Sequence, residues 1–104
     1  MAGNQAGHTV VEGDVFRDTV GTVCSEIGVG NENIETIVNL VKLSVQKNPR
    51  AHPSLPGRED MRFVFTSRVV RDGISVPALR ILIKLDDESR QVELLAVVSR
   101  DVRL

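Results

Sequence analysis

The sequence predicts a single α+β domain, with a short N-terminal strand, a helical hairpin and then a three-stranded antiparallel meander that carries the helices on one face. Apolar residues recur at helical spacing in the first half of the chain, and they alternate with period two from Met61 onward. The length of 104 residues, with 41% hydrophobic and 26% charged residues, is typical of one globular domain. We expect this domain over residues 9–100, between a disordered leader over 1–8 and a tail over 101–104.

The first half contains the strand and both helices. Thr9, Val10 and Val11 favour a short strand. Asp14 is positioned to cap a first helix that ends at Gly28, and its apolar stripe consists of Phe16, Val20, Val23 and Ile27. Asn31 is positioned to cap a second helix that ends before Pro49, and its inner face consists of Ile34, Ile37, Val38, Val41 and Val45. The short link between the two helices predicts an antiparallel hairpin.

The second half contains the predicted meander. Three of the four prolines fall within residues 49–57, which predicts an extended linker. A first long strand begins at Met61, and Asp72-Gly73 marks a turn. A second strand spans residues 79–85 and a third spans 91–99. Strict alternation places Val92, Leu94, Ala96 and Val98 on one side of the third strand.

Composition and motifs exclude several classes of protein. The chain has no Trp, no Tyr and three Phe, which argues against an aromatic platform for stacking bases, and a pI near 6.1 argues against general nucleic-acid affinity. We expect no metal and no cofactor, because His8, His52 and Cys24 form no ligand pattern. Cys24 is interpreted as a buried thiol and His52 as an exposed linker histidine.

Neither a secretory signal nor an apolar run of the roughly 18 residues that a membrane helix needs is visible. We therefore expect a cytoplasmic protein with no membrane partner. The single cysteine fits a reducing compartment.

Charge is distributed unevenly along the chain. Residues 1–49 hold six acidic and three basic residues, whereas residues 50–104 hold eight acidic and ten basic ones. The basic residues of the second half are nearly all arginine, whose planar fork of donors suits phosphate or carboxylate. They form either an anion-binding surface or a solvated sheet face with exposed ion pairs, and charge alone favours the second interpretation.

Three segments carry a resemblance to a known family. They are Asn48-Pro49-Arg50 through Leu55-Pro56-Gly57, Leu79-Arg80-Ile81-Leu82-Ile83-Lys84-Leu85-Asp86-Asp87, and Val97-Val98-Ser99-Arg100-Asp101-Val102. In their order and their Arg-Ile and Leu-x-Gly elements they resemble the RelE/ParE superfamily of bacterial toxins. The resemblance implies a toxin of a toxin–antitoxin system with an antitoxin protein as partner. RelE-like members cut messenger RNA on the ribosome, and ParE-like members poison DNA gyrase.

The resemblance also implies site residues. Arg62, Arg80 and Arg100 match basic positions of the family, where they would stabilise charge on a transferring phosphate if the chain were a nuclease. Arg58, Arg68 and Arg71 are further candidates for binding an anion or a partner. The sequence departs from the nuclease branch at its end, which reads Val102-Arg103-Leu104 with no tyrosine. A phenol cannot act as general acid or base here.

Three hypotheses follow, and they leave open whether the chain is an enzyme. The favoured one is a toxin-like protein that binds a cellular target such as DNA gyrase without nuclease chemistry. The alternatives are a ribosome-dependent messenger RNA endoribonuclease and a small non-enzymatic interaction module. For the last of these, a homodimer through an exposed strand edge or an apolar helix face is one arrangement.

Overall fold

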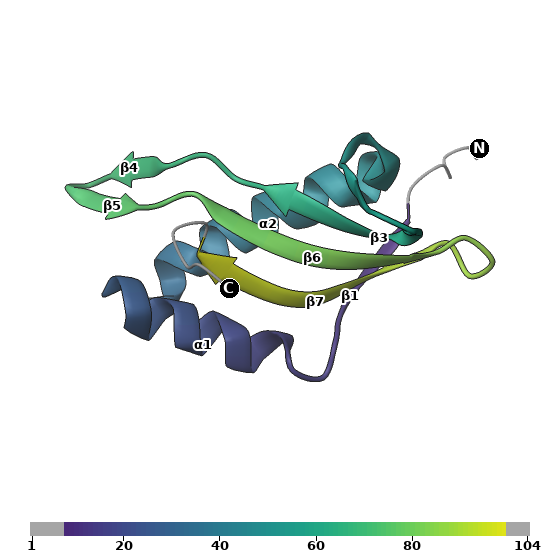
Figure 1. The fold of residues 1–104 in the computed structure, drawn as a ribbon. Helices are drawn as coiled ribbons and strands as arrows, with labels where there is room; N and C mark the ends of the chain where they lie inside the picture. The colour runs from purple at the N-terminus through teal and green to yellow at the C-terminus, as the bar shows by residue number, and fades with distance from the viewer. Residues whose placement is uncertain (1–7, 100–104) are drawn as a thin grey trace.

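A computed structural model describes residues 8–99 of the chain, so Arg100 and the predicted tail lie outside the described residues. The elements follow one another as β1 (Thr9–Glu12), α1 (Phe16–Ile27), α2 (Asn31–Lys47), the 3₁₀ turn η2 (Pro49–Ala51), β2 (Ser54–Leu55), β3 (Arg58–Phe65), β4 (Val69–Arg71), β5 (Ile74–Val76), β6 (Leu79–Asp86) and β7 (Gln91–Ser99) (Figure 1). The predicted α+β class is confirmed.

The main sheet has five strands in the order β1-β7-β6-β3-β2. Its centre is the predicted antiparallel meander of β3, β6 and β7, and β1 joins it in parallel with β7. The helices run in opposite directions on one face of this sheet, and the other face is left open (Figure 1). Within residues 8–99, no helix has the length and apolar character needed to span a bilayer.

A separate two-stranded ribbon, β4–β5, extends beyond the main sheet between β3 and β6 (Figure 1). Its turn is the predicted Asp72-Gly73 pair, whose φ angles of 52° and 78° are both positive. Tight hairpin turns of this kind match the twist of paired strands, and Gly adopts a positive φ without steric cost. The sequence therefore predicted the turn, although it did not predict the two short strands beside it.

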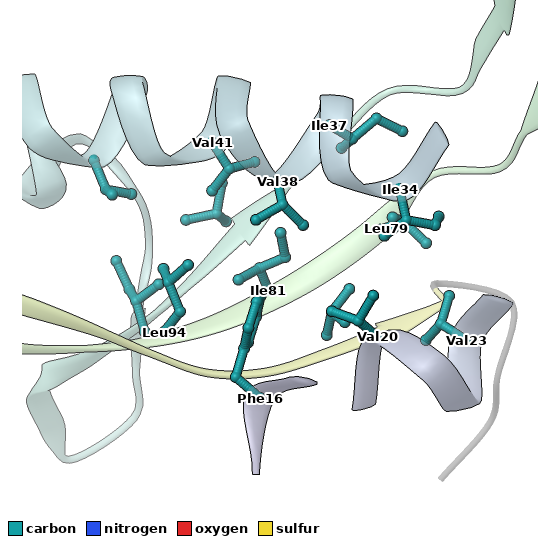
Figure 2. Packing of buried hydrophobic residues seen from close by; sticks show 14 of the residues in the cluster. Phe16, Val20, Val23, Ile34, Ile37, Val38, Val41, Leu79, Ile81 and Leu94 are labelled. Carbon is teal, nitrogen blue, oxygen red and sulfur yellow. The ribbon is translucent and has the colours of Figure 1, made fainter. Parts of the chain in front are cut away.

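The core lies between the helices and the sheet. Phe16 and Val23 of α1, Ile34 and Val38 of α2 and Ile81 of β6 are all buried in it. In Figure 2, Phe16 and Val38 lie on opposite sides of Ile81. The predicted inner faces of both helices are therefore confirmed. Cys24 is buried at the edge of this cluster, and desolvation raises the pKa of its thiol. It is the predicted buried thiol.

The predicted alternation of the last strand is wrong in its second half. Leu82 pairs with Ala96, but the next residue, Ile83, pairs with Leu94, so Leu95 is an extra residue in the ladder. This β-bulge reverses the side on which later residues fall. As a result Val97 is buried while Ala96 and Val98 are only partly covered.

The predicted helix caps and linker also need correction. The N-cap positions are Val15 and Gly30 rather than Asp14 and Asn31, and neither helix start has a side-chain cap hydrogen bond. The predicted end at Gly28 is confirmed, because it adopts the left-handed conformation with φ of 72°. The linker over residues 49–57 is not simply extended, since it forms η2 and pairs β2 with β3.

Candidate functional site

The open face of the sheet is formed by three rows of side chains across β3, β6 and β7. Register places Phe65, Arg80 and Val98 in one row, Phe63, Leu82 and Ala96 in the next, and Met61, Lys84 and Glu93 in the third. The first two rows are apolar except for Arg80. Within residues 8–99 no helix covers this face (Figure 1), and 44% of Phe65 is exposed. We call these nine residues the open face.

Arg80 is the one charged residue among the six residues of the first two rows. Its guanidinium carbon lies 5.9 Å from the centroid of the Phe63 ring, which is within the range of a cation–π contact. The Phe63 and Phe65 rings are themselves 6.0 Å apart and tilted by 42°. An arginine and two aromatic rings are thus held together on a rigid sheet.

This cluster was not predicted from the sequence, because the small number of aromatic residues in the chain does not show that two of them share one face of the sheet. Only three Phe are present, but two of them fall on one face beside Arg80. The signal was available in the period-two pattern, since Phe63 and Phe65 share the parity of Met61. Strand register then determines which residues of β6 they meet.

Arg62 does not join Arg80. It pairs in register with Ile83, which is fully buried, so its side chain lies on the helix side of the sheet. There its Nη1 donates hydrogen bonds of 2.8 Å to the His52 carbonyl and 3.1 Å to the Arg50 carbonyl. Arg62 therefore ties the segment after α2 to β3.

The remaining predicted residues are dispersed. Arg58 forms a two-point ion pair with Asp60, with both N–O distances 3.0 Å, and this raises the pKa of the Arg58 guanidinium. Arg68 donates from Nε to Ser75 Oγ at 2.9 Å on the ribbon. Arg71 lies near the turn of the same ribbon, 4.0 Å from Asp72. Arg100 lies outside the described residues.

His52 is half-buried rather than fully exposed. Its Nε2 lies 3.3 Å from Ser44 Oγ, and burial together with the nearby Arg62 cation lowers the pKa of the imidazole. The pair is on the helix side of the sheet, away from Arg80. Across residues 8–99, no group of three or more His, Cys, Asp or Glu side chains gathers as a metal site would require.

A separate charge cluster joins β1 to both helices. Glu12 accepts hydrogen bonds from Arg17 and, at 2.7 Å, from Lys42 Nζ, and Arg17 also pairs with Glu35. The Arg17 contact, aided by Lys42, lowers the pKa of Glu12 from 4.5 to about 2 despite some desolvation. The cluster is structural, because each of its members bridges elements rather than facing the open sheet.

This arrangement of β1, a helical hairpin and an antiparallel meander with one open face is shared with solved structures of RelE-type toxins. The structure is similar to the RelBE2 toxin–antitoxin complex from Mycobacterium tuberculosis, with a TM-score of 0.67 and 16% identity over 97% of this chain and 100% of that chain. It is also similar to a mutant of the E. coli toxin RelE in the free state, with a TM-score of 0.58 and 15% identity over 91% of this chain and 85% of that one. No family model and no curated protein matches the sequence. At these identities the likeness establishes the fold.

Proposed function

We propose that this chain is the toxin-like component of a toxin–antitoxin pair, and that it acts by binding a macromolecular target with its open face rather than by nuclease chemistry. The fold supports the first part, since both similar structures contain proteins described as toxins. An antitoxin protein is the expected partner, as in the RelBE2 complex.

The residue types of the open face support target binding rather than nuclease chemistry. Its two apolar rows contain Phe63, Phe65 and Leu82 with Arg80 among them. None of these four usually moves protons near neutral pH, and the side chains of the open face that can act as general acid or base, Lys84 and Glu93, pair with each other in the third row. Aromatic residues and arginine are, by contrast, the residues that most often dominate protein–protein interfaces. A protein target such as DNA gyrase fits this composition.

The test is inducible expression in bacteria, followed by assays of purified protein. Induction of the unaltered chain should arrest growth and inhibit gyrase supercoiling while messages stay intact. Arg80→Ala should abolish both effects and leave the protein folded. Arg50→Ala is the matched control, because it removes an exposed arginine that pairs with Asp87 away from the open face. An unaltered chain that never arrests growth would contradict the proposed toxin activity.

A second candidate function is the binding of single-stranded RNA on the ribosome, with or without cleavage. Phe63 and Phe65 favour it, because neighbouring aromatic rings on a sheet can stack bases while Arg80 contacts phosphate. Mapping of message ends after induction separates the two functions. New ends at codons in the ribosomal A site would favour this candidate over the gyrase target.

A further inference from the structure

A cleft on the helix side of the molecule separates α2 from the β4–β5 ribbon. Ile37 and Leu40 form its wall on α2, and Val69, Ile74 and Val76 form its wall on the ribbon. The cleft has a volume of about 140 Å³. A cavity of about 150 Å³ accepts a benzene molecule, so this one has room for one large apolar side chain.

The apolar surface continues beyond the cleft along α2. Leu40 and Leu43, one turn apart, are 61% and 55% exposed, and Val69 and Ile74 across the cleft are 37% and 39% exposed. From the cleft residue Asn33 to Leu43 the helix rises by about 15 Å, which is close to three turns. Clustered apolar exposure of this kind marks an interaction surface more often than isolated exposed residues do.

The charge at the cleft is positive. Of the described residues that line the cleft, Arg71 alone is charged, and none of them carries a carboxylate. Its neighbour Asp72 lies 4.0 Å away, and both side chains are highly exposed, so that pair is weak and leaves the Arg71 donors accessible. A second copy of this chain is a poor occupant, because in a two-fold dimer the same patch faces itself and brings Arg71 towards a patch with the same charge.

The cleft has few polar groups, and this indicates whether a bound segment would be extended or helical. An extended peptide laid over Leu40, Val69 and Ile74 would leave backbone N–H and C=O groups without partners. A helix satisfies its own backbone and presents only side chains. Apolar side chains on its inner stripe would fill the cleft, and a carboxylate beside them would reach Arg71.

We infer that the cleft between α2 and the β4–β5 ribbon is the docking site for an amphipathic helix with an acidic flank, supplied by a partner protein. That this partner is the antitoxin rests on the proposed function; the docking site itself does not. The site is distinct from the open face, so a partner bound there leaves Arg80 uncovered unless a second segment crosses the sheet.

The test is an NMR titration of the isotope-labelled full chain with two synthetic helices of about 15 residues, each held helical by a side-chain crosslink. Both carry the same leucine stripe, one flanked by glutamates and the other by lysines. The glutamate peptide should shift the amide signals of α2 and the ribbon and bind at least about tenfold more tightly than the lysine peptide. Arg71→Glu should reverse the preference, and Leu40→Asp should abolish binding.

Val70→Asp is the matched control, because Val70 is 68% exposed and lies on the opposite face of the same ribbon. It should bind the glutamate peptide as the unaltered chain does. Equal binding of both peptides, shifts confined to β3 and β6, or signals that depend on protein concentration without peptide would each overturn the inference. None of these outcomes depends on whether the chain arrests growth, so the proposed function is tested separately.

Discussion

The two faces of the central strands each carry an arginine, but the two arginines make different contacts. Arg62 and Arg80 lie on neighbouring strands, and the sequence resemblance predicted the same role for both. Arg62 lies beneath the segment after α2 and donates to two carbonyls, whereas Arg80 lies on the open face over a phenyl ring. Which side of its strand an arginine occupies, rather than its residue type, therefore decides whether it ties backbone segments together or lies on the open face.

On the helix side of the sheet, the largest loss of stability is expected at Phe16. The side chain is fully buried between α1 and the sheet, so Phe16→Ala should lower the free energy of unfolding by about 3–5 kcal/mol. Phe65→Ala removes an equal side chain from the open face and should cost about 1 kcal/mol or less. Urea unfolding of both variants measures the contrast, and equal losses would contradict the division of the faces.

The two arginines should differ in how much each contributes to the free energy of unfolding. Arg62→Ala removes two hydrogen bonds to backbone carbonyls, of which the one to His52 is partly buried, and should destabilise the protein by about 1–3 kcal/mol. Arg80→Ala should cost less than Arg62→Ala in the same thermal and urea unfolding measurements. A larger loss of stability for Arg80→Ala would assign it a structural role instead.

Much of this fold could be predicted from the sequence, because apolar periodicity determines which face of each helix and of β6 is buried. The bulge at Leu95 could not be predicted, since a single extra residue leaves the pattern of Val and Leu almost unchanged while it reverses the facing of Val97. The separation of Arg62 from Arg80 depends on strand register, which requires the pairing of Phe65 with Arg80 to be known. The Phe63–Phe65 pair, by contrast, follows from the period-two pattern of a single strand, although the number of aromatic residues in the chain gives no sign of it.

The Glu12 cluster predicts a smaller, pH-dependent effect. Its folded pKa of about 2 lies below the ordinary value of 4.5, so the stabilisation is present above pH 4.5 and is lost progressively as the pH falls towards 2. Because the Arg17 side chain is about half exposed, we expect a loss of only about 1 kcal/mol. Glu12→Gln should lower stability at pH 7 and flatten the acid limb of a stability–pH curve. An unchanged acid limb would show that Glu12 contributes nothing.

The smallest effect is expected at the exposed ion pair of Arg50 and Asp87. Both side chains are more than half exposed, so Asp87→Asn should change the free energy of unfolding by about 0.5 kcal/mol or less. Chemical denaturation at low and high salt measures it. A large salt-dependent loss would mean that this surface pair holds η2 to the β6–β7 turn.

We propose that this protein acts on its target through the open face of the sheet. The test is growth after induction of Phe65→Asp, with Val70→Asp as a control outside that face, where the wild-type side chain is 68% exposed against 44% for Phe65. Val70→Asp should arrest growth as the unaltered chain does, while Phe65→Asp should stay folded and allow growth to continue. Growth arrest by a folded Phe65→Asp variant at the level of the unaltered chain would contradict it.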